Sequence, residues 1–396
     1  MTSACNIALI GQKFMGRAHS NAYMKAGKFF NVPIQPVMHT IVGLDLISLA
    51  PFADRWGWKK YSTTWKDVVK DPAIDLVDVS TPNYMHADQA LAALSAGKHV
   101  ACEKPLANTL KEARSMRNAA VRSRRSKTFV WFNYRRCPAV ALAHQLVKSG
   151  RLGAIRHVRA SFLQDWARPE VPLGWRFQKK YAGSGAHGDL NSHVVDLTRF
   201  VTGLEFVEIT GALANTFVTE REVITPPPKT GGRSRSRRKK TVMGKSDVDD
   251  CVLFLARLTD GAVASLEASR VATGHKVSNS IELNGELASL KFSFEDMNSL
   301  WFYDDADSKQ IAGWRKIICT SPGEHPYAGA WWPDGHGIGY EHTFVHMAAE
   351  MMAVLAGEEP IVPIPDFADA YETQRVLEAA MLSAKHRAAV KLTEIK

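Results

Sequence analysis

Residues 6–16 read Asn6-Ile7-Ala8-Leu9-Ile10-Gly11-Gln12-Lys13-Phe14-Met15-Gly16. The apolar run from Ile7 to Ile10 is typical of a buried parallel strand, and residues 17–24 have a helical pattern. A strand, a glycine turn and a helix in this order form the first unit of a dinucleotide-binding fold. Gly11 would make the tight turn, Gly16 would let the helix pack close to the strand, and the helix N-terminus would meet the pyrophosphate.

Two charged residues refine this prediction. Lys13 stands where the dinucleotide fingerprint usually has a glycine that approaches the phosphate, and it either donates charge to a phosphate or points outward. A second strand is predicted at residues 40–45 and ends at Asp45. A carboxylate there binds the ribose hydroxyls and repels a 2′-phosphate, which favours NAD over NADP; the alternative is an N-cap or a surface acid.

Strands and helices alternate up to about residue 134. Further strands are predicted at 74–80, 99–102 and 129–133, with helices at 85–96 and from a capping box at Thr109 onward. This order predicts a parallel α/β sheet, and ligands of such sheets sit beyond the carboxyl ends of the strands. The residues at those ends are Gly11, Thr81, Glu103, Lys104 and Asn133.

The pattern changes after a helix predicted at 138–149. Alternating segments predict strands at 155–164, 207–217, 249–258, 262–270, 278–284, 288–294 and 300–303, with turns at 259–261 and at Asn284-Gly285. Two helices, at about 341–356 and 366–388, close the chain. We therefore predict an NAD-binding domain at 1–134, built on a parallel sheet. An α+β domain at 135–396, with a large, open, mostly antiparallel sheet, would serve substrate binding and oligomerisation.

The basic charge of the chain is concentrated in one segment. The formal net charge is +10, and residues 226–245 contain eight Lys or Arg and no acid, so the rest carries +10 − 8 = +2. Charge, Pro and Gly predict a mobile surface loop here. A nucleic-acid contact is the less favoured alternative, because no aromatic residues are interleaved with the charges.

Composition also bears on location. The five cysteines lie far apart without a C-x-x-C motif, which favours a reducing cytosol over a disulfide scaffold. The chain starts without a signal-peptide pattern and has no apolar run of about 18 residues. We expect a cytoplasmic protein without a membrane segment.

Two stretches carry the chemistry. Lys104 follows a strand end at the mouth of the predicted nucleotide platform, where desolvation or a neighbouring cation makes a lysine useful in acid–base catalysis; taken on its own, it is better explained as a surface lysine. Asp189, His193 and Asp196 are spaced to share one helix face. One carboxylate could orient His193 while the other contacts a ligand. A structural histidine, or a metal pair lacking a third ligand, are the alternatives.

These motifs together give the chain a resemblance to the glucose–fructose oxidoreductase, inositol dehydrogenase and rhizopine-catabolism family. The markers are Gly11 to Gly16 with the following His19, Thr81-Pro82-x-x-x-His86, Glu103-Lys104-Pro105 and Asp189-x-x-x-His193-x-x-Asp196. The resemblance is greatest to the sugar 3-dehydrogenases of levoglucosan dehydrogenase type, through segments such as 132–136, 163–166, 175–179 and 337–340. His187 departs from the small or apolar residue usual at its position.

The resemblance implies an oxidoreductase that acts on sugars or polyols with NAD or NADP as cofactor, and Asp45 makes NADP the less favoured of the two. It implies catalytic roles for Lys104, His193 and Asp189, and either Lys104 or His193 can take the hydroxyl proton. The expected cofactor-binding residues are Gly11, Phe14, Met15, Gly16, Asp45, Thr81, Asn83, His86, Glu103 and Lys104. The expected substrate-binding residues are Asn133, Arg135, Gln164, Trp166, Arg176, Asp189 and His193.

The resulting hypothesis is oxidation of a secondary ring hydroxyl, at C3 of a sugar, glycoside or anhydrosugar such as levoglucosan, by a homo-oligomer without a bound metal. An inositol or polyol dehydrogenase is one alternative. A redox-neutral enzyme that recycles its NAD while it cleaves or epimerises a glycoside is another. A non-enzymatic nucleotide sensor on the same fold is the third, and the joint presence of Lys104, Asp189 and His193 argues against it.

Overall fold

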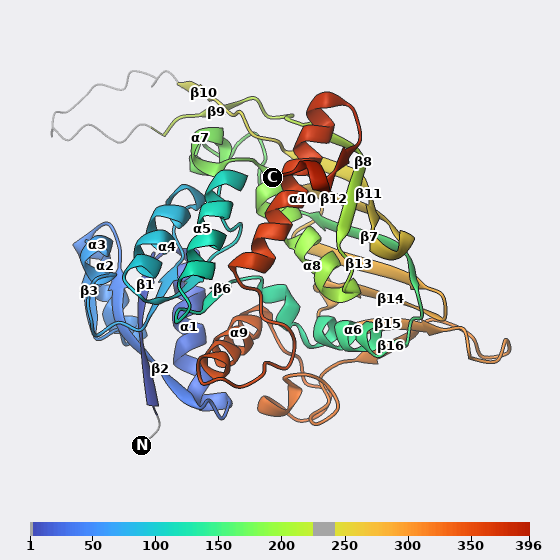
Figure 1. Cartoon of the computed structure of the whole chain (residues 1–396), viewed down its shortest axis with the longest axis horizontal. Coiled ribbons are helices and arrows are strands. Elements are labelled where there is room, and N and C mark those ends of the chain that lie inside the picture. Colours follow the sequence, from blue (N-terminus) through green and yellow to red (C-terminus); the bar gives the residue numbers. More distant parts are fainter. Residues whose placement is uncertain (1–2, 225–241) are drawn as a thin grey trace, which may run out of the picture.

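The computed structural model describes residues 3–224 and 242–396. In this part of the chain, a parallel sheet and a larger mixed sheet stand apart, and helices fill the space between them (Figure 1). Within the same residues, no helix combines the length and the apolar character needed to cross a membrane.

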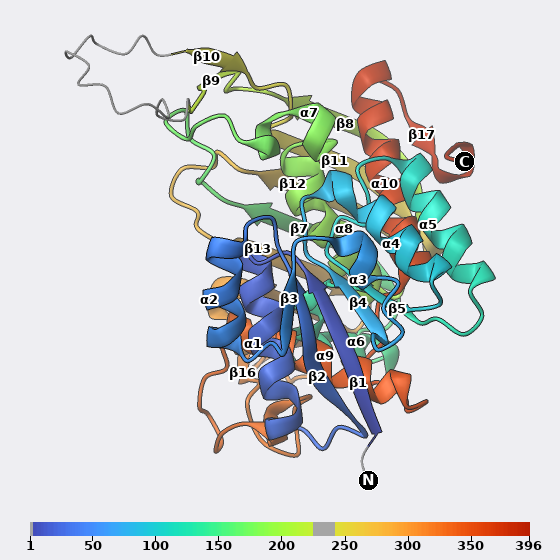
Figure 2. The same cartoon turned by 90° about the vertical axis from the view of Figure 1, so that its left-hand side faces the viewer.

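The N-terminal sheet confirms the predicted parallel α/β unit. Its described strands run in the order β3-β2-β1-β4-β5-β6, and every neighbouring pair is parallel (Figure 2). The strands are β1 (Ser3–Ile10), β2 (Ile34–Val42), β3 (Lys60–Ser62), β4 (Leu76–Val79), β5 (His99–Cys102) and β6 (Thr128–Val130). The helices between them are α1 (Phe14–Phe29), α2 (Leu46–Trp56), α3 (Trp65–Val68), α4 (His86–Ser95) and α5 (Leu110–Arg122).

Strand β1 is apolar throughout its second half because both faces of the sheet are covered. Ile7 and Leu9 belong to a core with the buried residues of α1, while Ala8 and Ile10 belong to the core that includes α4. Helix α9 (Tyr340–Leu355), from near the end of the chain, completes the first of these cores by packing against α1. Alternate side chains of one strand thus contact two different helix layers.

The second sheet confirms the predicted large, mostly antiparallel architecture. Its described strands run in the order β16-β15-β14-β13-β7-β12-β11-β8-β17, and among these neighbours β7 and β12 alone are parallel. The strands are β7 (Ile155–Leu163), β8 (Phe206–Asn215), β11 (Cys251–Leu258), β12 (Val263–Ser269), β13 (Ser278–Gly285), β14 (Ala288–Ser293), β15 (Ser299–Asp304), β16 (Arg315–Ile318) and β17 (Val390–Lys391).

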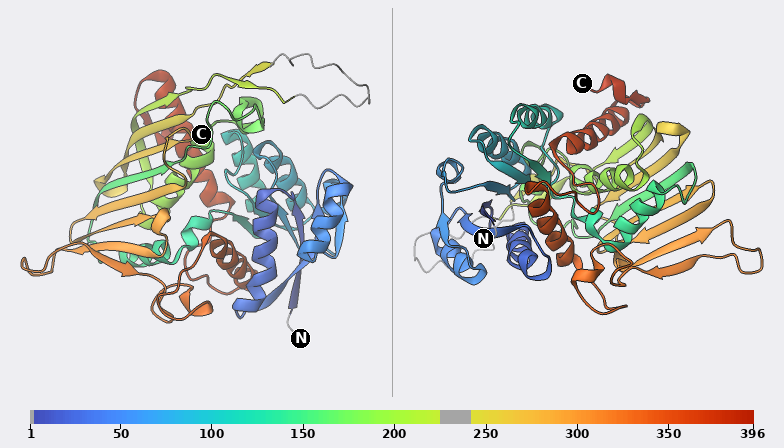
Figure 3. Two further views of the ribbon diagram at one scale, coloured as in Figure 1. Left: turned by 180° about the vertical axis from the view of Figure 1, so that it is seen from behind. Right: turned by 60° about the horizontal axis from the view of Figure 1, so that its bottom comes forward.

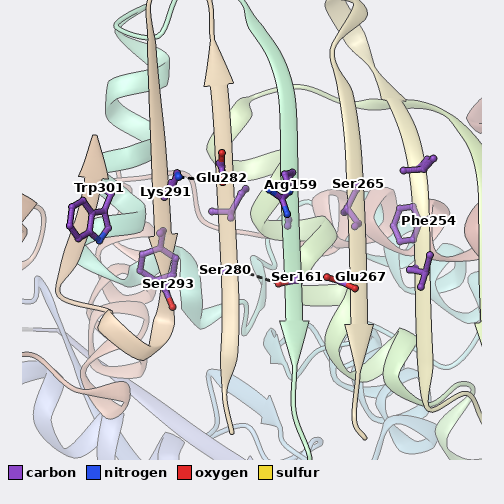
Figure 4. Close-up of a pocket in the computed structure, with 16 residues that line it drawn as sticks. Arg159, Ser161, Phe254, Ser265, Glu267, Ser280, Glu282, Lys291, Ser293 and Trp301 are labelled. Carbon is purple, nitrogen blue, oxygen red and sulfur yellow. Dashed lines mark hydrogen bonds and ion pairs between the residues drawn. The ribbon is translucent and has the colours of Figure 1, made fainter. Parts of the chain in front are cut away.

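One face of this sheet is covered by helices and the other is open. Helices α6 (Pro138–Lys148), α8 (Ser192–Thr202) and α10 (Phe367–His386) lie on the face toward the parallel sheet (Figure 3). Side chains alternate accordingly: Val252, Phe254 and Ala256 of β11 are buried, while Leu253 and Leu255 point outward. Figure 4 shows this outer face, where residues of neighbouring strands stand side by side.

Three local predictions are wrong or reach beyond the described residues. Asn284 and Gly285 are strand residues of β13, and the turn follows at Glu286 and Leu287. The strand predicted at 129–133 ends at Val130, and Asn133–Arg136 form a 3-10 turn. Residues 226–241 of the predicted basic loop lie outside the described residues, but its end, β10 (Met243–Lys245), pairs with β9 (Glu220–Glu222).

Candidate active site

The glycine turn after β1 has the close approach that its sequence predicts. Gly11 has a φ of 119°, and a Cβ on Gly16 would lie 2.1 Å from the Gly11 carbonyl oxygen, so α1 can begin here only with glycine. Lys13 occupies the N-cap of α1 with an exposed side chain that makes no capping bond. No side chain of the described residues accepts from the N–H groups of this first turn, which leaves them available to an anion.

Asp45 follows β2 and caps the next helix. Its exposed carboxylate accepts hydrogen bonds from the N–H groups of Ile47 and Ser48, each at 3.1 Å. Bonds from the Ser48 and Ile47 groups lower the pKa of Asp45. The N-cap alternative is therefore present in the structure, and since two carboxylate oxygens can accept further bonds, it is compatible with ribose binding.

The remaining predicted cofactor residues line the ends of β1 and β4. His86 is fully buried, and its ring nitrogens face the carbonyls of Pro105 and Thr81 at 3.0 and 2.9 Å. The hydroxyl of Thr81 donates to Gln89, and the amide of Asn83 donates to the Ala182 carbonyl. The exposed Phe14 ring stacks on Tyr340, and Met15 is half-buried. These side chains mainly tie the strand-end loops together.

Lys104, just after β5, reaches across to the C-terminal part of the chain. Its Nζ donates to the Asp189 carboxylate at 3.0 Å and to the Asp189 carbonyl at 2.8 Å. Only 16% of each of these two side chains is exposed. The two stretches that the sequence singles out are therefore in direct contact.

The segment that carries Asp189 is held by a buried carboxylate. Asp249 accepts the N–H groups of Gly185 and His187 at 2.8 and 2.7 Å. A Cβ on Gly185 would lie 1.7 Å from the Asp249 carbonyl oxygen, so close packing rather than flexibility requires this glycine. Residues His187–Asn191 then form a π-helical turn that leads into α8. Such turns occur often at functional sites, where they re-aim side chains.

Asp189 is surrounded by cations. Besides Lys104, Arg176 approaches its carboxylate to 3.4 Å and Arg270 to 3.8 Å. Burial favours the neutral acid, but Lys104, Arg176 and Arg270 outweigh it and hold the pKa of Asp189 below its ordinary value. Asp189 is thus a fixed negative charge that orients Lys104.

His193 lies in an aromatic surround. Its ring makes edge contacts with Tyr134 and Phe132, at centroid distances of 4.7 and 5.9 Å. Burial, and then the charge of Lys104, place the pKa of His193 well below its ordinary value, so the ring is neutral at neutral pH. Among the described residues, neither Asp189 nor Asp196 hydrogen-bonds this ring, and the prediction that one of these carboxylates orients it is wrong. The π-helical turn before α8 breaks the simple spacing between Asp189 and His193, and the carboxylate of Asp196 is bonded by Arg135 instead.

Three of the residues singled out by the sequence are engaged elsewhere. Arg135 is buried and donates to Asp196, with Nε to Oδ2 at 2.9 Å, and also to Asp369 of α10. The amide of Asn133 donates to Thr343 of α9. His187 is buried, with its Nε2 donating to the Leu377 carbonyl and Asn191 donating to its Nδ1. These contacts join elements of the fold and lie outside the cluster around Lys104.

Two of the predicted substrate residues, Gln164 and Trp166, are in contact. The indole N–H of Trp166 donates to the Gln164 side chain at 2.9 Å. The Arg270 guanidinium lies 5.3 Å from the Trp166 ring, in cation–π range, and Arg270 is 1% exposed. Sequence reasoning missed Arg270, although an arginine directly after a strand with an apolar inner face was a usable signal. It also missed Tyr134, whose only sequence signal was its aromatic neighbourhood.

Comparison with known proteins assigns the chain to a family. Residues 5–131 match the oxidoreductase family with an NAD-binding Rossmann fold (GFO_IDH_MocA), and residues 140–291 match the GFO/IDH/MocA C-terminal domain. Levoglucosan dehydrogenase of Pseudarthrobacter phenanthrenivorans is 38% identical, over 98% of each chain.

Solved structures give the same assignment. An oxidoreductase domain protein from Kribbella flavida is 44% identical with a TM-score of 0.90, covering 98% of this chain and 99% of that one. Levoglucosan dehydrogenase in complex with NADH and levoglucosan is 37% identical with a TM-score of 0.89, covering 98% and 100%. The chain therefore belongs to the GFO/IDH/MocA family of oxidoreductases, whose N-terminal half is an NAD-binding Rossmann fold.

Proposed function

We propose that this protein oxidises a secondary ring hydroxyl, at C3, of a sugar, a glycoside or an anhydrosugar such as levoglucosan, with NAD as acceptor. The observation that carries the proposal is the contact of Lys104 with Asp189 beside the neutral His193. This contact supports the proposal because Lys104 follows β5, and ligands of parallel sheets bind at the carboxyl ends of the strands.

The residues around the glycine turn fit a dinucleotide. Gly16 approaches Gly11 too closely for a side chain at this turn, and within residues 3–224 and 242–396 no side chain accepts from the first turn of α1, so its N–H groups can donate to a phosphate. Bound NAD would accept the hydride from the carbinol carbon. Gly11, Gly16 and the α1 N-terminus would hold its pyrophosphate, and Asp45 its ribose.

The acid–base roles follow from charge. Lys104 is an ion-paired ammonium that can donate to the reacting hydroxyl and stabilise a developing alkoxide. His193 is neutral and so can accept the proton. Once protonated, its ring would be stabilised by the nearby charge of Asp189. We therefore assign the base to His193 and the electrostatic role to Lys104.

Polar groups for a polyhydroxylated ring surround this pair. Gln164 and Arg176 offer hydrogen-bonding groups, and Trp166 an aromatic face, on the substrate side of Asp189. Buried sugar hydroxyls need such partners. Arg270 joins this group because it lies against both Asp189 and Trp166.

A panel of sugars, anhydrosugars and inositols, assayed for NADH formation, tests the proposal. We expect stoichiometric NADH with a pyranose or anhydrosugar and a ketone at C3, identified by NMR of the product. Turnover restricted to inositols would mean that the substrate is a cyclic polyol and not a sugar. Product formation without net NADH would mean that the enzyme is redox-neutral and not a dehydrogenase. No turnover with any member of the panel would reject the proposal.

Replacing Asp45 with asparagine is expected to weaken the preference for NAD over NADP about tenfold or more. Asparagine is as good an N-cap as aspartate, so α2 stays intact, but the charge that repels a 2′-phosphate is lost. The kcat/KM values for the two cofactors measure this preference. Asp54→Asn, on the same helix, serves as the control, and an unchanged preference in Asp45→Asn would contradict the ribose assignment.

We further propose that a second copy of the chain covers the open face of the large sheet. Leu253 and Leu255 are exposed by 40% and 56% on this face, and Trp301 by 40%. Charges of both signs accompany them, as in the pair of Lys291 and Glu282 (Figure 4). Such mixed apolar and complementary surfaces suit a self-association that follows twofold symmetry.

Replacing Leu255 with glutamate is therefore expected to lower the molar mass in solution to that of the monomer. Light scattering during size-exclusion chromatography measures it. Val121→Glu, at a still more exposed apolar site on α5, should leave the mass unchanged. A wild type that is already monomeric, or an unchanged mass for Leu255→Glu, would reject this interface.

A further inference from the structure

A buried histidine links the core of the parallel sheet to the active site. His19 lies on α1 just after the glycine turn and is fully buried. Its Nδ1 faces Asp78 of β4 and its Nε2 faces Glu103 after β5, each at 3.0 Å. Carboxylate oxygens only accept hydrogen bonds, so both ring nitrogens act as donors and the ring is an imidazolium.

The surroundings of His19 support this charge. Trp131 stacks on the ring at a centroid distance of 4.0 Å, and its indole N–H donates to Asp78. The hydroxyl of Tyr23 donates to the same carboxylate at 2.8 Å. Burial lowers the pKa of His19, but Asp78 and Glu103 outweigh it and raise the value to about 9.

Glu103 connects His19 to the active site. Its Oε1 is held by His19, and its Oε2 accepts the backbone N–H of Lys104 at 3.1 Å. The next hydrogen bond in this series joins the Lys104 ammonium to Asp189. A continuous set of charge-assisted contacts therefore runs from the interior of the sheet to the proposed catalytic lysine.

We propose that His19 is a positioning residue: the hydrogen bond from its Nε2 fixes Glu103, and through Glu103 the backbone of Lys104, against Asp189 and His193. The inference rests on the proposed function, because its readout is turnover. It assigns to the first helix of the nucleotide platform a role in the acid–base step. In metal sites, loss of a partner that orients a ligand in this way costs about ten- to a hundredfold in activity.

Two neutral variants separate positioning from fold stability. The amide nitrogen of asparagine takes the place of Nδ1 and can keep the bond to Asp78, whereas that of glutamine takes the place of Nε2 and can keep the bond to Glu103. Each variant removes the charge and one buried bond. We expect kcat to fall about ten- to a hundredfold in His19→Asn and to be largely rescued in His19→Gln, while KM for the sugar changes little in both.

Tyr23→Phe is the matched control. It removes a bond to Asp78 within the same buried cluster and does not touch Glu103, so kcat should stay at the wild-type value while the melting temperature falls. Equal kcat values for His19→Asn and His19→Gln, measured beside an active wild type, would overturn the inference. No turnover by the wild type itself would instead reject the proposed function.

The charge of the ring has a readout that does not need activity. The folded pKa of about 9 lies above the ordinary value near 6.5, so the charged ring stabilises the fold fully below about pH 6.5, and this contribution is lost as the pH rises through about 9. The difference in free energy of unfolding between the wild type and His19→Gln, measured by denaturant unfolding, should therefore decrease from pH 6.5 to pH 9.5. In the wild type, Asp78 and Glu103 face the ring and Tyr23 donates to Asp78; all three residues are kept in His19→Gln. A difference in free energy of unfolding that does not change with pH would overturn the inference, even if neither His19 variant were active.

Discussion

Lys104→Met is expected to lower kcat by about two to four orders of magnitude, the range typical of a group that acts on the transferred proton. Methionine keeps the length of the side chain but removes the ammonium that Asp189 holds at 3.0 Å. A developing alkoxide would then have no cation beside it, whereas the glycine turn that holds the pyrophosphate is unaffected. Initial rates at saturating sugar and NAD measure this loss.

Binding of NAD, measured by calorimetry, should change by less than about threefold in this variant, since the proposed pyrophosphate and ribose contacts are made by the glycine turn, the α1 N-terminus and Asp45. Lys111→Met, an exposed lysine on α5, is the control and should retain full activity. A loss of NAD affinity as large as the loss of kcat would mean that Lys104 belongs to the cofactor site and not to the proton-transfer step.

Arg135→Met is expected to destabilise the fold by about 3–5 kcal/mol, the cost of removing one partner from a buried ion pair. The guanidinium is 4% exposed and lies between Asp196, 3% exposed, and Asp369. Without it, a buried carboxylate loses its closest cation. Denaturant unfolding measures the effect. Arg156→Met removes an exposed pair with Glu286 and should cost less than about 1 kcal/mol.

The effect of Arg135→Met should also depend on pH. Burial, against the opposing charge of Arg135, raises the pKa of Asp196 to about 6. A carboxyl group whose pKa is higher in the folded than in the unfolded state stabilises the fold when it is protonated. Leaving Asp196 without Arg135 therefore costs less free energy of unfolding as the pH falls through 6. The destabilisation should therefore be smaller at pH 5 than at pH 8. An equal loss at both values would show that Asp196 is not the carboxylate left unpaired.

Features set by local pattern could be predicted from the sequence. The apolar run before Gly11 predicts its strand because a strand buried on both faces is continuously apolar. The segments after residue 155 predict theirs because a strand with one buried face alternates between apolar and polar residues. The contact of Lys104 with the segment at Asp189 also follows, since both stretches carry the polar residues of one ligand site.

Features set by distant partners could not be predicted. Arg135 was expected at the substrate, but one of its acceptors is Asp369, 234 residues away, and no local pattern links the two. The π-helical turn at His187–Asn191 depends on Asp249, which comes from another strand end. The spacing of an ideal helix therefore misplaced Asp189 relative to His193 and Asp196.

The packing of α9 against α1 has a consequence for the order in which the chain becomes structured on the ribosome. The apolar surface made by Tyr23 and Leu9 is closed by Phe344 and Met351, which are synthesised more than three hundred residues later. A nascent nucleotide platform would thus expose an unfinished core throughout most of translation. We expect a fragment that stops at the proposed domain boundary near residue 134 to aggregate, and co-expression of a segment containing α9 to rescue its solubility.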